Sequence, residues 1–177
     1  MLAATPAPVP GVAPSTFARP APRAASGQAT ASHYVHPGRL LTGEATGDFT
    51  TVVGSGAVVC AWDPVANVAG MAHFLLPEKG NAPAAPRFGD VALAQLIDEL
   101  EKMGGNRARL RASLFGGSAP PIVAESGHLG ERNVQQALGF LAAHAIPVQQ
   151  KDVGGTGGRK VVFAPAAGTA SVVRLAG

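Results

Sequence analysis

The chain has 177 residues and a mass of 17.7 kDa, which is enough for one domain of ordinary size. Hydrophobic residues make up 46% of it and charged residues 14%, and no apolar run approaches the roughly 20 residues of a membrane-spanning helix. Arg19, Arg23 and Arg39 carry the net charge of +3, because residues 44–177 hold eleven basic and eleven acidic side chains. With 5% aromatic residues and no basic cluster, the composition argues against a nucleic-acid-binding protein.

The N-terminal part differs in composition from the rest of the chain. Residues 1–39 are rich in Pro and Ala, so we expect a disordered leader followed by a folded domain at 40–177. This leader is either a tether without further function or a weak docking segment. It lacks the basic start and continuous apolar stretch of a secretory signal, so we expect a cytoplasmic protein. A single cysteine, Cys60, excludes an internal disulfide and a zinc site built from several thiolates.

Hydrophobic patterning beyond the leader predicts several strands and two helices. In chain order the expected elements are strands at 48–53, 57–62 and 68–76, a loop at 78–87, a helix at 91–103, a strand at 109–115 with one face in water, a helix at 131–144, and strands at 160–163 and 171–175. The first helix is the clearest, because Gly104-Gly105 supplies a left-handed stop after its last apolar residue. Strands packed against two amphipathic helices indicate an α+β domain.

Six sequence blocks carry a resemblance to a known family. They are TTVVGSGAVVCAWDP at 50–64, GMAHFLLP at 70–77, RFGD at 87–90, FGG at 115–117, GERNV at 130–134 and DVGGTGGRKV at 152–161. In this order and spacing they resemble the chemoreceptor glutamine deamidase family, known as CheD.

The resemblance implies a fold, an activity and partners. The fold would be a three-layer α/β/β sandwich of mixed sheets with two main helices. The activity would be that of a Cys-dependent hydrolase of bacterial chemotaxis, which converts glutamine side chains of methyl-accepting chemotaxis receptors to glutamate without a cofactor. Some relatives also bind a CheC-type phosphatase, and no membrane insertion is implied.

The resemblance also assigns roles to single residues. Carried over by position, His73 is the catalytic histidine and Thr50 the threonine that supports it. The turn Gly54-Ser55-Gly56 would hold the developing oxyanion with its backbone N–H groups. Gly56, however, stands where the family has its nucleophilic cysteine.

Three substitutes for the missing nucleophile can be weighed. Cys60 lies four residues further, about 13 Å along a strand, so it is interpreted as a small buried hydrophobe, with relocated catalysis as the alternative. Ser55 is one residue away and faces the opposite side of the strand. Water activated by His73 is the third route, although His73 alone would equally fit a satisfied core histidine. The histidines form no set that indicates a metal site.

Two other motifs have structural and functional interpretations. Gly154-Gly155-Thr156-Gly157-Gly158 precedes a strand and lacks a phosphate-loop ending, so it is interpreted as a glycine turn. Glu131-Arg132-Asn133 opens a helix, where an acid is favoured by the dipole; the family resemblance makes it part of the wall of the active-site cleft.

Two functions therefore remain open. The first is an active deamidase of chemoreceptor glutamines. The second is a catalytically silent CheD-like protein, a pseudoenzyme that binds receptors or a CheC-type phosphatase as an adaptation regulator. The missing nucleophile favours the second, because losing a covalent route costs many orders of magnitude in rate.

Overall fold

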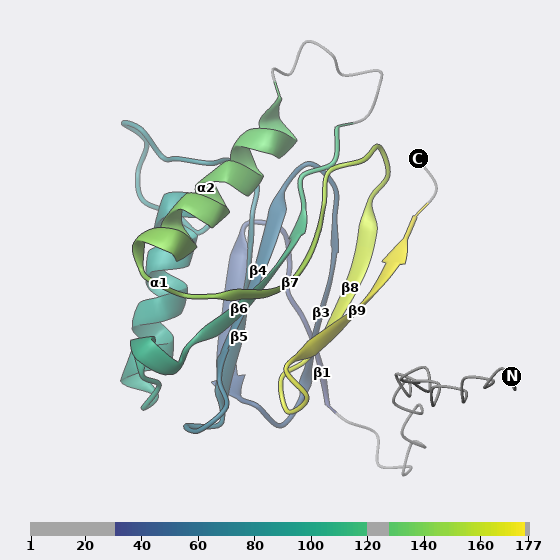
Figure 1. Cartoon of the computed structure of the whole chain (residues 1–177). Coiled ribbons are helices and arrows are strands. Elements are labelled where there is room, and N and C mark those ends of the chain that lie inside the picture. The colour runs from purple at the N-terminus through teal and green to yellow at the C-terminus, as the bar shows by residue number, and fades with distance from the viewer. Residues whose placement is uncertain (1–30, 120–127, 176–177) are drawn as a thin grey trace, which may run out of the picture.

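Two β-sheets and two α-helices stack in three layers in the computed structural model, which describes residues 31–119 and 128–175 (Figure 1). Both helices cover one face of the first sheet, and the second sheet packs against its other face. This arrangement confirms the predicted α/β/β sandwich of the α+β class. Residues 1–30, most of the predicted leader, lie outside the described residues.

The first sheet has five strands in the order β2-β5-β4-β6-β7. Their bounds are Arg39–Glu44 for β2, Ala57–Asp63 for β4, Val68–Phe74 for β5, Arg111–Gly116 for β6 and Val148–Val153 for β7. Every residue of β4 and β5 is buried, because helices cover one face and the second sheet covers the other. The sequence accordingly shows them as continuous apolar runs.

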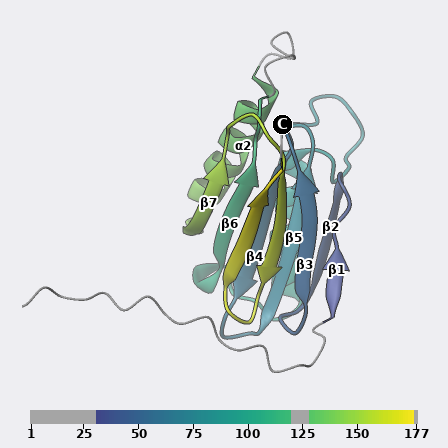
Figure 2. The same ribbon diagram turned by 90° about the vertical axis from the view of Figure 1, so that its right-hand side faces the viewer.

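The second sheet has four strands in the order β1-β3-β8-β9, and it is turned toward the viewer in Figure 2, with the first sheet behind it. The bounds are Ser32–Tyr34 for β1, Asp48–Val53 for β3, Arg159–Ala164 for β8 and Thr169–Arg174 for β9. In β3, burial alternates, with Phe49, Thr51 and Val53 facing the first sheet. Alternation is the expected pattern for a sheet with only one covered face.

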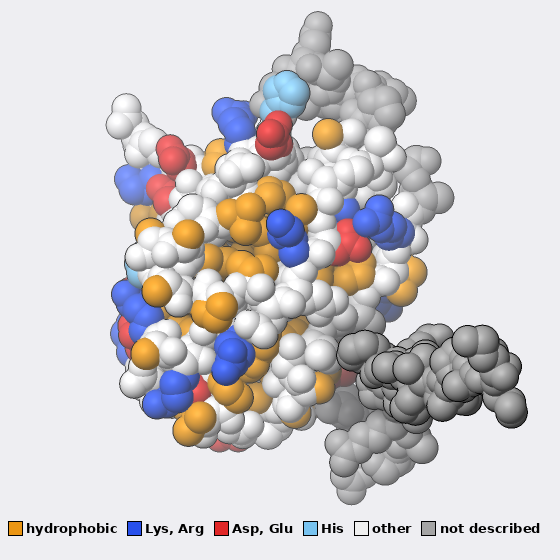
Figure 3. All heavy atoms as spheres, viewed as in Figure 1, with side chains coloured by type: hydrophobic (Ala, Val, Ile, Leu, Met, Phe, Trp, Pro, Cys, Tyr) orange, Lys and Arg blue, Asp and Glu red, His pale blue; other side chains and the backbone are white. Residues whose placement is uncertain are grey.

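The helices α1 (Gly89–Lys102) and α2 (Leu129–Ala143) bury apolar stripes against the first sheet. Leu93, Ile97 and Leu100 of α1 are buried, at the helical spacing that the sequence predicted. On the face shown in Figure 3, hydrophobic side chains gather over the area where α2 and β7 lie in Figure 1, with charged side chains of both signs around them. No helix in the described part of the chain is long and apolar enough to cross a bilayer.

Two sequence predictions need correction. The short β1 lies inside the predicted leader 1–39 and pairs in parallel with β3, and Val35 beyond it is 0% exposed, so the folded part begins before residue 40. Because β1 is exposed and consists of polar residues and Tyr34, its sequence carries no alternation to reveal it. The predicted wet face at 109–115 is also wrong. β6 is buried from Ala112 to Gly116, because Ala112 and Leu114 pack in the core under the helices and Phe115 packs in the core between the two sheets.

Strands β2 and β7, both at edges of the first sheet, were not predicted either. Their burial alternates only between exposed and half-buried residues, so hydrophobic patterning is weak in both. An edge strand forms because its backbone pairs with a neighbouring strand, and this pairing cannot be read from a single sequence.

The first turn of α2 packs directly onto the backbone of residues 117–118. A Cβ atom at Gly130 would lie 2.5 Å from the carbonyl oxygen of Gly117 and 2.6 Å from that of Ser118. Both distances are shorter than any real contact of this kind, so only glycine lets the helix approach this segment.

We therefore expect Gly130→Ala to lower the free energy of unfolding by about 1–3 kcal/mol through overpacking. Gly139→Ala is the matched control in the same helix, because Gly139 is exposed and a Cβ there has nothing within 4 Å. It should raise stability by about 0.5–1 kcal/mol. Urea denaturation measures both, and a shift in the same direction for the two variants would contradict the close packing at Gly130.

Candidate active site

The candidate site lies where the chain crosses from one sheet to the other. Strand β3 of the second sheet leads into the turn Gly54-Ser55-Gly56, and the turn leads into β4 of the first sheet. His73 lies near the end of β5, and its Cα atom is paired with those of Val58 in β4 and Arg39 in β2. The turn and the histidine thus meet at one end of the sandwich.

The side chain of Thr51 fixes the tautomer of His73. Thr51 Oγ1 lies 2.7 Å from the carbonyl oxygen of Val35 and 3.0 Å from His73 Nδ1. A hydroxyl has one proton and a carbonyl only accepts, so the Thr51 proton goes to Val35 and Oγ1 accepts from Nδ1–H. This assignment leaves the lone pair of the imidazole on Nε2.

Nε2 faces the position of the missing nucleophile. A Cβ atom at Gly56 would lie 3.3 Å from His73 Nε2. A side chain at this position would therefore meet the nitrogen that carries the lone pair, which is the geometry that a nucleophile and its base require. The structure thus brings together His73 and the hydroxyl that orients it, and it places Gly56, which has no side chain, opposite Nε2.

The surroundings of Gly56 are built for a residue without a side chain. The same Cβ atom would lie 2.6 Å from the carbonyl oxygen of Phe74 and 3.5 Å from Leu75 Cδ2. The first distance is too short for a backbone contact, so any larger residue at position 56 would require the end of β5 to shift.

Burial lowers the pKa of His73 from 6.5 to about 4. The physical cause is desolvation, which disfavours the charged imidazolium. His73 is only 2% exposed. At neutral pH the ring is therefore uncharged, and it can accept a proton at Nε2.

The structure places Thr51, and not the predicted Thr50, beside His73. The Thr50 hydroxyl donates to the carbonyl oxygen of Val161 at 3.1 Å. Successive residues of a strand face opposite sides, so of these two neighbours only Thr51 faces the interior. The apolar residues Phe49 and Val53 mark the buried face of β3, and this alternation is the signal that would have identified Thr51.

Cys60 lies in the core between the two sheets, away from His73 in the strand register. It is 0% exposed, and its Cα atom is paired with that of Met71. Burial raises the pKa of the Cys60 thiol far above its ordinary value. A protonated, enclosed thiol has the properties of a structural cysteine, which agrees with its interpretation as a small buried hydrophobe.

Each carbonyl oxygen of the turn accepts a hydrogen bond from another segment. Gly54 accepts from the backbone N–H of Ser118 at 3.0 Å, and Gly56 accepts from that of Gly117 at 2.7 Å. Ser55 accepts from Asn133 Nδ2 of α2 at 2.9 Å. These bonds fix the orientation of the turn, whereas the oxyanion role of its N–H groups stays a prediction.

A buried arginine supports the segment next to the turn. Arg159 is 1% exposed and donates to Asp152 Oδ1 at 2.8 Å and to the carbonyl oxygen of Gly116 at 3.2 Å. Although desolvation of Asp152 opposes ionisation, Arg159 and Arg174 hold the pKa of its carboxyl below the ordinary value. The glycine-rich segment 154–158 thus connects β7 to β8 beside the ion pairs of Asp152, consistent with its interpretation as a turn.

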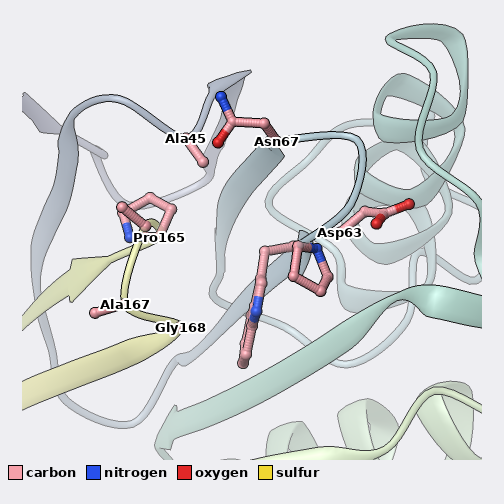
Figure 4. Close-up of a pocket in the computed structure, with 9 residues that line it drawn as sticks. Ala45, Asp63, Asn67, Pro165, Ala167 and Gly168 are labelled. Carbon is pink, nitrogen blue, oxygen red and sulfur yellow. The ribbon is translucent and has the colours of Figure 1, made fainter.

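A cavity of about 120 Å³ lies at the other end of β4 from the turn, beside Asp63 (Figure 4). Asp63 is 1% exposed, and its carboxylate accepts from three backbone N–H groups and from Arg109. These bonds use the carboxylate oxygens of Asp63, which is the one ionisable residue among those that line the cavity. Among the described residues, no group of three or more His, Cys, Asp or Glu could hold a metal ion.

Comparisons with known proteins identify the family. The model of the family described as CheD chemotactic sensory transduction matches residues 75–174. A probable chemoreceptor glutamine deamidase CheD 1 of Anaeromyxobacter dehalogenans is 42% identical over 167 residues, which cover 93% of this chain and 97% of that protein. A probable chemoreceptor glutamine deamidase CheD of Bordetella petrii is 42% identical over 130 residues, covering 72% of this chain and 58% of that longer protein.

The chain therefore belongs to the CheD family, as its six sequence blocks predicted. Among solved structures, a Neisseria meningitidis protein of family DUF152 matches with a TM-score of 0.46 and 13% identity, over 84% of this chain and 76% of that chain. This likeness is too distant to bear on function.

The pairing of Thr51 with His73 can be tested against its neighbour. We expect Thr51→Val to lower the free energy of unfolding by about 1–3 kcal/mol, because it leaves the buried Val35 carbonyl and His73 Nδ1–H without a partner. Thr50→Val is the matched control and should cost well under half as much, since Thr50 is itself only half-buried and bonds no other side chain. Equal losses in urea denaturation would contradict the assignment of Thr51.

The low pKa of His73 also predicts a pH dependence of stability. Between pH 6.5 and about 4 the unfolded chain binds a proton at this residue that the folded chain does not. Stability should therefore fall as the pH drops through this window, by about 3 kcal/mol in total. His73→Gln should lose this slope, measured as the difference in urea midpoint between the two chains at each pH. A slope that persists in the variant would assign the effect to other groups.

Proposed function

We propose that this protein binds chemoreceptors through the CheD site without the covalent hydrolysis of glutamine. The observation that carries the proposal is Gly56, which has no side chain to act as a nucleophile. A Cβ atom at this position would lie 3.3 Å from His73 Nε2, so a side chain there would face the base. Attack by a thiolate splits amide hydrolysis into two easier steps, and its loss costs several orders of magnitude in rate. The protein would then act as an adaptation regulator in the cytoplasm.

The two nearest alternatives for a nucleophile support the same conclusion. Cys60 is enclosed, and the pKa of its thiol is raised. Ser55 precedes Gly56 by one residue, and a serine hydroxyl needs a well-aligned base far more than a thiol does. Neither side chain takes the place that Gly56 leaves, and the Phe74 carbonyl oxygen crowds that place.

The rim of the site carries side chains suited to a receptor helix. Leu75 and Leu76, just past His73, are each 38% exposed. Arg39, opposite His73 in β2, and Arg132, near the start of α2, are exposed, and within the described residues neither forms an ion pair. Exposed leucines together with basic groups that form no ion pair fit an amphipathic helix with acidic residues beside its apolar stripe. A CheC-type phosphatase is the second partner we propose, on family membership alone.

An active deamidase is the second candidate, and one observation favours it. His73 is neutral with its lone pair on Nε2, so it is poised to take a proton from water at the edge of the turn. Direct attack of water on the amide would then need no residue at position 56. This route forgoes the covalent intermediate, so it would be slow.

The experiment follows a gain of about 1 Da per glutamine converted to glutamate in a glutamine-bearing receptor fragment, alongside direct binding of the same fragment. The native chain should bind it and show no turnover above a His73→Ala variant. Gly56→Cys should gain turnover, and Gly56→Ala is the matched control, because it meets the same Phe74 carbonyl without adding a thiol.

Other outcomes would overturn parts of the proposal. Turnover by the native chain that is lost in His73→Ala and kept in Cys60→Ala would establish the water route and an active enzyme. Turnover lost in Cys60→Ala would assign the attack to Cys60. Failure of the native chain to bind the fragment would remove the receptor as its partner.

A further inference from the structure

Asn133 is a buried polar residue that neither the core nor the proposed chemistry accounts for. It lies near the start of α2 and is 0% exposed. A buried carboxamide costs stability unless its groups are bonded, so its partners indicate what it does. The family resemblance suggested only that it is part of the wall of the cleft.

The side-chain amide of Asn133 connects the two segments that form the site. Nδ2 donates to the carbonyl oxygen of Ser55 at 2.9 Å and to that of Leu75 at 3.0 Å. Ser55 immediately precedes Gly56, and Leu75 follows His73 by two residues. One NH₂ group therefore uses both of its protons to tie the turn to the end of β5.

The other atom of the carboxamide adds a second observation. Asn133 Oδ1 is buried and has no hydrogen-bond partner among the described residues. A native structure tolerates an unsatisfied buried acceptor only where something else benefits from the side chain. Here the benefit lies in the two hydrogen bonds that Nδ2 donates to Ser55 and Leu75, which we call the clamp. An apolar residue of similar size would remove the unbonded Oδ1, but it would remove the clamp as well.

We infer that Asn133 is a positioning residue that sets the distance between position 56 and His73 Nε2. It acts through backbone carbonyls and touches no reacting atom. The inference concerns the site on which the proposed function rests, yet it holds whether or not the native chain hydrolyses glutamine. In a chain with a nucleophile at position 56, the clamp would keep that nucleophile within reach of the base.

The first test uses the native chain and reads His73 directly. With the clamp intact, His73 should titrate near 4 in ¹⁵N NMR of its imidazole, with Nδ1 protonated in the neutral form. In Asn133→Ala the turn is free to move away from β5, water reaches Nε2, and the pKa should rise toward 6.5. Asn133→Asp should do the same, because an ionised carboxylate cannot donate to either carbonyl oxygen.

Leu141→Ala is the matched control for mere loss of stability. Leu141 is 1% exposed near the far end of the same helix and has no bond to the turn. It should destabilise the fold and leave the His73 pKa unchanged. Arg39, opposite His73 in β2, is the charged neighbour on that strand and stays in place in all variants. An unchanged His73 pKa in both Asn133 variants would overturn the inference.

A second test reads the distance chemically. Cys60 is the one cysteine of the chain, so Cys60→Ala with Gly56→Cys leaves a single thiol opposite Nε2. Adding Asn133→Ala should slow its alkylation by iodoacetamide at pH 7 about tenfold, because Nε2 then lies too far away to take the thiol proton as a general base. Equal rates would count against the clamp. Neither test involves a receptor, so failure of the proposed function would not affect them.

Discussion

The close approach of the turn 54–56 to the end of β5 is the constraint on which the site depends. The chain crosses from the second sheet to the first at this turn, so the turn links the two sheets covalently. The Phe74 carbonyl oxygen would lie 2.6 Å from a Cβ at Gly56, so a larger residue there would require the end of β5 to shift. The residue at position 56 is therefore coupled to the position of β5.

Backbone contacts also position α2 and residues 117–118, which pack around the turn. Gly130 lets α2 reach the carbonyl oxygens of Gly117 and Ser118, and the N–H of Gly117 in turn bonds Gly56. The helix α2 is therefore connected to the turn in two ways. One connection runs through the backbone of Gly117, and the other is the hydrogen bond from the Asn133 side chain to Ser55. A site assembled this way is positioned by the fold as a whole, and side-chain substitutions elsewhere on its surface would leave its geometry intact.

The sequence predicted those parts of the fold whose burial produces a strong pattern. Strands β4 and β5 were evident as apolar runs, and α1 was evident from its helical spacing and its glycine stop. Strands β1, β2 and β7 lie at sheet edges, and they are held by pairing that no local pattern records. In the site, His73 and Gly56 followed from the family's blocks. Thr50 was assigned by its position in those blocks, and only the alternation of β3 shows that its neighbour Thr51 faces His73. Asn133 was placed in the wall of the cleft, but its two partners are distant in sequence.

The presence of His73 and Thr51 in one hydrogen-bonded pair does not by itself argue for activity. Thr51 bonds the Val35 carbonyl and His73 in a buried network, and removing one member would leave another without a partner at a cost of about 1–3 kcal/mol. A chain that lost its nucleophile would therefore retain the histidine for stability alone. The same argument does not apply at position 56, because Gly56 has no side chain and takes no part in this network. Of these three positions, it is the one that stability would leave free to change.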